Sequence, residues 1–372
     1  MAKLKNEHPP LLPMVDTLNG SCAKGKIIVP DADRLILCDA DGAIKKTFGN
    51  RKKIPGKMGV HSMYIRSMDN DEKLTFEGSI SGCKFGQNLY TLGDVPSASK
   101  IAVKRALKEC GEREKAEELK LEDISLDRVD LAVNFRLESE EEVLSVLKQI
   151  KRQLIEQYGP TRTNGTTVCW APRDGKEYMI VMYAKGRQLL NAMQRRKQRP
   201  PYWGALIEEA SNILRVEVRV RGAELRDLGL GKASDWHEDS AFKVFNKYFE
   251  RLKLLKVTSS VFSKDELTAL PQRLRPVLAL HKLGFDLEQV YTPRTCQRHR
   301  DFFRKRGIDL RCPSQPENTA MSVLDYLSPD KAVCEAPEWM IKQGLAPRNP
   351  AVSALKKIPA SKFQNKRKRR MF

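Results

Sequence analysis

Alternation of apolar and polar residues predicts a series of short strands in the first part of the chain. The predicted strands lie at 25–30, 34–40, 59–68, 73–80, 126–137, 165–172, 178–185 and 212–222, with the pair 165–172 and 178–185 forming a hairpin. Helical periodicity falls between and after them, at 99–120, 139–158, 189–197, 223–230 and 240–256. Helices inserted between hairpin-like strands favour an α+β fold with a central antiparallel sheet.

The strand pattern stops near Ser260, where two helices are predicted at 263–284 and 286–306. We therefore expect a main domain over residues 1–256 and a small all-helical domain over 257–345. The last segment, 346–372, is basic and poor in apolar residues, which predicts a disordered tail.

Four of the predicted strands have one apolar and one polar face, because residues two apart share a face. The polar faces of three of them carry a carboxylate, at Glu77, Asp130 and Glu217. The fourth carries Tyr183 and Lys185. If these strands are neighbours, the five side chains converge on one side of the sheet. The alternative is an ordinary half-exposed sheet with surface salt bridges.

Such a convergence would combine a metal site with a nucleophile. Carboxylate oxygens suit Mg²⁺ or Mn²⁺, which stabilise charge in phosphoryl transfer. A tyrosine hydroxyl is a weak nucleophile until activated, and a nearby ammonium such as Lys185 favours the phenolate or protonates a leaving group. Tyr178 lies five residues from Tyr183 and faces the opposite side of the strand. The alternative for Tyr183 alone is a strand-end tyrosine with its hydroxyl in water.

The net charge of the chain indicates what kind of partner it binds. The chain of 372 residues has a formal net charge of +20, which favours a polyanion, with nucleic acid ahead of an anionic membrane surface. It has no apolar run long enough to span a bilayer and no secretory signal pattern, so we expect a cytoplasmic protein without membrane partners. The eight cysteines form no C-x-x-C pair, which argues against a zinc ribbon or redox motif.

An ordered set of motifs resembles the gene II-type replication initiators of filamentous bacteriophages and the related plasmid initiators. The motifs are "PMVDTL", "FEGSISGCKFGQNLYT", "LDRVDLAVNF", "MYAKGRQLL", "LRVEVRVRGAELRDLGL" and "TPRTCQRHRDFFRKRGIDL", which together span about residues 14–310. The resemblance implies a nickase that cuts one strand of a double-stranded origin through a 5′-phosphotyrosine intermediate. The 3′-hydroxyl then primes rolling-circle synthesis, and the enzyme later rejoins the displaced single strand.

The resemblance also implies roles for individual residues and partners. Tyr183 would be the nucleophile and Lys185 its electrostatic helper, with Asp130, Glu217 and, less strongly, Glu77 holding Mg²⁺ or Mn²⁺. It implies the cytoplasm of a bacterial host and reliance on the host helicase, polymerase and single-strand-binding protein. Two departures matter: Gly86-Gln87-Asn88 stands where relatives often read Gly-His-Asn, and the chain lacks the histidine pair of many rolling-circle enzymes. An all-carboxylate or asparagine-assisted site is therefore expected.

Basic residues supply candidate DNA contacts, since cations near phosphates give salt-dependent affinity without reading sequence. Those on the polar strand faces or just after Tyr183 are Arg128, Arg215, Arg219, Arg187, Arg195 and Arg196. The segment 286–305 is also compatible with a helix-turn-helix, in which Gln297, Arg298 and Arg300 would reach base edges. Solvated helix faces and ordinary helix packing are the alternatives.

Two other functions compete with the nickase. A noncatalytic, sequence-specific DNA-binding initiator or repressor would use the same basic surfaces. An RNA-binding module is weaker, because aromatic residues make up 7% of the chain and no aromatic-rich RNA-binding strand is evident.

Overall fold

The computed structural model describes eleven stretches of the chain: residues 11–57, 61–158, 162–164, 166–172, 175–195, 199–252, 254, 270–282, 285–306, 310 and 323–348. Its contacts divide the chain into two units. The first contains residues 1–143, 162–252 and 329–372, and the second contains 144–161 and 253–328. This division differs from the expected boundary at residue 256, because 329–348 pack with the first unit and 144–158 with the second.

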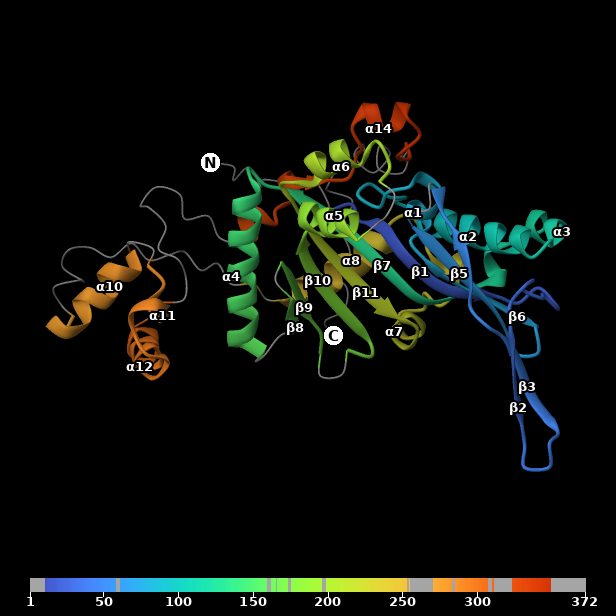
Figure 1. The fold of residues 1–372 in the computed structure, drawn as a ribbon, viewed down its shortest axis with the longest axis horizontal. Coiled ribbons are helices and arrows are strands. Elements are labelled where there is room, and N and C mark those ends of the chain that lie inside the picture. The colour runs from blue at the N-terminus through green and yellow to red at the C-terminus, as the bar shows by residue number, and fades with distance from the viewer. Residues whose placement is uncertain are drawn as a thin grey trace, which may run out of the picture. The chain divides into compact units, whose positions relative to one another are not determined.

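A ten-stranded antiparallel sheet forms the first unit (Figure 1). In spatial order its strands are β4 (Lys52–Pro55), β5 (Ser62–Met68), β6 (Lys73–Gly78), β1 (Met14–Cys22), β7 (Ile124–Arg136), β11 (Ile213–Arg221), β10 (Tyr178–Ala184), β9 (Thr167–Trp170) and β8 (Arg162–Asn164). The short strand β12 (Ala332–Val333) pairs with Asn134 and Phe135 near the C-terminal end of β7, where β1 no longer pairs with that strand. A separate hairpin, β2 (Arg34–Cys38) with β3 (Ile44–Gly49), extends from the sheet.

One face of the sheet is apolar and carries the main core. Val129, Leu131 and Val133 of β7 are at most 1% exposed. Helices α2 (Val95–Glu109) and α8 (Ser240–Phe249) contact the central strands, and Phe249 of α8 stacks on Phe135 with ring centroids 6.4 Å apart. Alternation places these residues opposite the polar ones, as the sequence predicts.

The polar face is covered at one end. There α5 (Lys185–Gln194), α6 (Trp203–Ala210) and α14 (Glu338–Lys342) form a second hydrophobic cluster with the segment 86–92. Gln87 holds this segment: its Nε2 donates to the carbonyls of Tyr90 and Leu345, both at 2.7 Å, and its Oε1 accepts from two backbone amides of the segment. A buried amide with all these partners orders the covering layer.

The remaining helices of the first unit are α1 (Ile80–Phe85), α3 (Arg113–Glu117) and α7 (Gly222–Asp227). Helix α4 (Glu140–Tyr158) crosses the division between the units. Its Glu142 amide donates to Ser139 Oγ, so Ser139 is the N-cap of this helix. These elements confirm the predicted α+β class. The predicted helix 99–120 is in fact two helices, because Gly111 adopts a positive φ of 81° between them.

The described part of the second unit is helical. Its elements α10 (Arg275–Lys282), α11 (Leu287–Val290) and α12 (Pro293–Arg304) pack around Leu278, Cys296 and Phe303, and α13 (Val323–Tyr326) follows. Thr292 caps α12 and separates it from α11, so the predicted helix 286–306 is two helices. In the part of the chain that the structure describes, no helix combines the length and apolar character of a membrane span. The predicted disordered tail lies almost wholly outside the described residues.

Candidate active site

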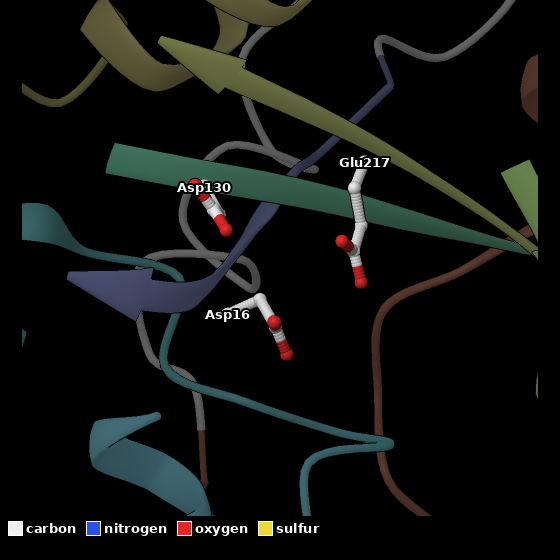
Figure 2. Close-up of side chains that lie close together, drawn as sticks. All are labelled: Asp16, Asp130 and Glu217. Atoms are coloured by element: carbon white, nitrogen blue, oxygen red, sulfur yellow. The ribbon is translucent and has the colours of Figure 1, made fainter. Parts of the chain in front are cut away.

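Three buried carboxylates meet on the polar face, at the centre of the sheet. Asp16 of β1, Asp130 of β7 and Glu217 of β11 each offer an oxygen within 4.8 Å of the others. Their side chains project from the same side of three neighbouring strands (Figure 2). The residues are 7%, 1% and 2% exposed, which is unusual for three acids together.

Strand register explains how two of these acids meet. On β7, Asp130 pairs with Arg219 of β11, and Glu217 pairs with Ala132, two residues further along. Both acids therefore point to the same face on adjacent strands. Asp16 arrives differently: the β1–β7 register shifts between Val15 and Thr17, so Asp16 is the extra residue of a β-bulge. A bulge bends the strand and re-aims a side chain, here toward the other two acids.

Three arginines neutralise the cluster. Arg215 is fully buried and donates to Asp16 Oδ1 at 2.8 Å, with its Nε 3.3 Å from Glu217 Oε1. Arg219 donates to Glu217 Oε2 at 2.8 Å and lies 3.5 Å from Asp130. Arg128 binds Asp130 in a two-point contact. Without such partners, buried carboxylates would be too costly to keep ionised.

Burial and charge act in opposite directions on these acids. Burial raises the pKa of Asp130 to about 6, against the lowering effects of Arg128 and Arg219. Burial likewise opposes ionisation of Asp16, but Arg215 and Lys185 outweigh it and hold the pKa of that carboxyl below its ordinary value. The cluster thus contains one strongly ionised acid and one poised nearer neutrality.

Tyr183 of β10 belongs to this cluster. Tyr183 is 7% exposed, and its hydroxyl donates to Glu217 Oε1 at 2.5 Å. Burial, followed by the charge of Glu217, raises the pKa of Tyr183 well above its ordinary value. In this arrangement the proton stays on the phenol, so the expected phenolate is not favoured, and Glu217 is the group placed to receive that proton.

Lys185 begins α5, directly after β10, and is fully buried. Its Nζ donates to Asn88 Oδ1 at 2.9 Å and to Gln188 Oε1 at 3.0 Å, and lies 5.7 Å from the centroid of the Tyr183 ring. Burial, with Arg215 second, lowers the pKa of Lys185 to about 7. The pKa of this amine beside the phenol is therefore close to neutral pH.

Sequence reasoning missed Asp16, and it named Asn88 only within the segment Gly86-Gln87-Asn88 and gave it no individual role. Asn88 donates to Asp16 Oδ1 at 3.1 Å while accepting from Lys185, so it connects the lysine to the acids. The signal for Asp16 was a single acid within the apolar run "PMVDTL". Gln87, which stands where relatives often have a histidine, bonds to the covering segment and not to the acids.

Glu77 and Arg215 have surroundings that differ from those expected. Glu77 is on β6, two strands from Asp130, and its register partner through Asn19 is Arg128. It is 36% exposed and pairs with Arg51, so the expectation that it joins the metal ligands is not met. Arg215 cannot contact a DNA phosphate as expected, because its guanidinium is buried and its hydrogen bonds are internal. Tyr178 faces the other side, as predicted, and packs on the Tyr248 ring.

The remaining predicted DNA contacts that the structure describes reach the surface. Arg187 pairs with Glu140, Arg195 is exposed, and Arg196 lies outside the described residues. In the second unit, Arg298 is exposed on α12, whereas Arg300 pairs with Glu288 of α11. Gln297 of the same helix donates to Asp301 at 2.9 Å. These contacts within the unit do not test DNA binding, so the helix-turn-helix stays a prediction.

The polar sheet face thus contains three buried acids that could hold a cation, with the hydroxyl of Tyr183 bonded to one of them. A family model that describes the N-terminal part of the phage replication-associated protein matches residues 14–239. This chain therefore belongs to that replication-associated protein family, the filamentous-phage gene II-type initiators that its motifs resemble. The match includes Asp16, Asp130, Tyr183 and Glu217.

A curated relative agrees with this assignment. The replication-associated protein of Enterobacteria phage I2-2 is 26% identical over 192 residues, which are 50% of this chain and 53% of the relative. The matched part thus spans about half the length of that protein.

Proposed function

We propose that this protein initiates rolling-circle DNA replication by nicking one strand of a double-stranded origin and later rejoining the displaced strand. The observation that carries the proposal is the hydrogen bond from the Tyr183 hydroxyl to Glu217, inside a cluster of three acids. A nucleophile, its proton acceptor and a cation site are what phosphodiester transfer requires. Family membership supports the same role.

The residues suggest a division of tasks. Tyr183 Oη would form the bond to phosphorus as its proton passes to Glu217. The bond from phosphorus to the 3′ oxygen would break, leaving a 5′-phosphotyrosine and a free 3′-hydroxyl. Lys185, with its pKa of about 7, can carry the proton that the departing 3′ oxygen needs. Rejoining is the same step in reverse, with a 3′-hydroxyl as the attacking group.

The acids fit a hard divalent cation, because three carboxylates offer oxygens within 4.8 Å of one another. Asp16, Asp130 and Glu217 would hold Mg²⁺ or Mn²⁺, which would offset the negative charge of the phosphate. Arg128 and Arg219 have side chains 28% and 32% exposed, so both can turn away from the acids toward solvent or toward phosphate. Arg215 has no such freedom, and it would remain as a fixed counter-charge.

DNA would approach from the side marked by Arg219, which contacts two acids and reaches solvent. Arg128, Arg187 and Arg195 are further contacts for the DNA backbone, with the helical second unit as an additional DNA-binding element. The host helicase, polymerase and single-strand-binding protein are the partners that such a mechanism needs.

The test is a covalent adduct on a supercoiled origin plasmid. Full-length protein with Mg²⁺ or Mn²⁺ should nick the plasmid and remain attached to DNA through denaturing electrophoresis. Tyr183→Phe should abolish both results, while Tyr178→Phe, changed on the opposite face, should retain them. EDTA should prevent the adduct. Normal nicking by Tyr183→Phe would refute the assigned role.

A noncatalytic DNA-binding initiator is the second candidate, and the deep burial of Tyr183 favours it. In that case the hydroxyl and Glu217 would only stabilise the sheet. The origin would be bound without nicking, and the wild-type protein would form no covalent adduct with any divalent cation.

A further inference from the structure

We propose that a polar hollow beside the acids binds one unpaired base of the strand being cut, with a preference for guanine. This proposal rests on the proposed nicking function. The hollow has a volume of about 230 Å³ and opens on the same sheet face as the acids. Its lining residues include Asn19 of β1, Thr75 and Glu77 of β6, Tyr64 and Arg66 of β5, and Arg51.

Register connects the hollow to the acids. Tyr64 pairs with Glu77, Glu77 with Asn19, and Asn19 with Arg128, which forms one row across four strands. Asp130 is two residues along β7 from that row, and Arg128 binds it. With strands about 4.8 Å apart, Tyr64 at the far side of the row lies roughly 14 Å from Arg128. Tyr183 is on β10, two strands beyond β7, so a strand cut there would reach the hollow several nucleotides from the nick.

The walls suit a base more than a phosphate. Arg51 lies over the Tyr64 ring, 4.1 Å from its centroid, and is 49% exposed, so the pair presents a flat and accessible stacking surface. Unpaired bases stack on aromatic rings and on guanidinium planes. The carboxylate of Glu77 would repel a phosphate placed in the hollow. The cations Arg51 and Arg128 flank that carboxylate and suit phosphates on either side.

Glu77 also supplies specificity. Its carboxylate accepts from Arg51 at 2.5 Å and lies 3.9 Å from Arg128, which leaves further acceptor capacity on a 36% exposed side chain. Among unpaired bases, guanine presents two adjacent donors on its pairing edge, and these match a carboxylate. Asn19 adds an amide on the next strand. Glu77, once expected to be a metal ligand, is thereby assigned to base binding.

The test measures DNA binding without cleavage. Full-length protein is titrated in EDTA against two fluorescent single strands of about ten nucleotides, one of thymidines alone and one with deoxyguanosines among thymidines. Wild type should bind the deoxyguanosine strand about fivefold more tightly. Glu77→Gln should remove that preference, and the control Glu72→Gln, an exposed acid in the β5–β6 turn, should keep it. Tyr64→Leu should weaken both strands about fivefold or more, with rescue by Tyr64→Phe.

The outcomes separate this proposal from the nicking function. If Glu77→Gln retains the preference, or Tyr64→Leu binds both strands like wild type, the hollow is not a base site, even where the covalent adduct forms. If wild type forms no adduct but the binding results are as stated, the nicking function fails and the base site stands. Thermal melting of each variant checks that the fold is intact.

Discussion

The polar face of the sheet has a closed end and an open end, and they use the same residue types differently. At the closed end, Asp16, Asp130, Glu217 and Arg215 are buried, and Asp16 and Arg215 bond to the segment 86–92. At the open end, Glu77 and Arg51 form an ion pair that remains 36% and 49% exposed. The covering layer, not the strand pattern, therefore separates the buried acid cluster from the exposed ion pair.

Removing an arginine should distinguish the two ends most strongly. Arg215→Met leaves buried Asp16 and Glu217 without their shared cation, so we expect the free energy of unfolding to fall by about 3–5 kcal/mol. Arg51→Met removes an exposed partner and should cost at most about 1 kcal/mol. Chemical denaturation in EDTA measures both. Equal losses for the two variants would contradict the difference between the ends.

The free energies of unfolding of Arg215→Met and Arg51→Met can also be compared with and without excess Mn²⁺. A divalent cation among the three acids replaces part of the charge lost with Arg215. The ion should therefore stabilise Arg215→Met more than it stabilises Arg51→Met. A destabilised Arg215→Met that does not respond to Mn²⁺ would mean that the acids hold no cation.

Conservative changes at single acids separate the two ends further. Glu217→Gln keeps the shape of the side chain but removes a charged ligand, so Mn²⁺ affinity should fall at least about tenfold. Glu77→Gln, at the open end, should bind Mn²⁺ like wild type. Titration calorimetry on the full chain measures the two affinities. A weakened Glu77→Gln would restore Glu77 as a ligand.

A pH-dependent effect is expected for Lys185 at the closed end. Folding lowers its pKa from the ordinary 10.5 to about 7, chiefly by burial. Between pH 7 and pH 10.5 the Lys185 amine holds a proton in the unfolded chain but not in the folded one. Its contribution to the free energy of unfolding therefore increases as the pH rises through this window. Lys185→Met should lack that rise. Unfolding free energies of both proteins across that pH window measure the difference, and parallel curves would show that Lys185 is charged when folded.

Alternation correctly predicted that Asp130, Glu217 and Tyr183 share a face, because the two-residue period of a strand leaves little freedom. It did not predict strand order, and so it grouped Glu77 with acids that lie two strands away or more. Asp16 was missed because a bulge interrupts the alternation on which the reasoning depended. Each error arose where pairing between distant segments decides the result.

The alternation of apolar and polar residues also could not predict which side chains on the polar face are buried. Arg215 is on the face that its position predicts, but the residues that enclose it come from other parts of the chain. Its guanidinium reaches the carbonyl of Leu89, 126 residues away in sequence. Gln87 in turn bonds to Leu345, 258 residues away. A one-dimensional pattern carries no information on such contacts, which is why Arg215 was taken for a DNA contact.

Mass spectrometry of the protein–DNA adduct would identify the nucleophile itself. Wild-type protein is reacted with origin DNA and Mg²⁺, digested with nuclease and protease, and searched for peptides that carry a nucleotide phosphate. We expect the modified peptide to contain Tyr183, with the phosphate on its phenolic oxygen. A phosphate on another tyrosine, or nicked DNA without any modified peptide, would refute the catalytic role of this residue.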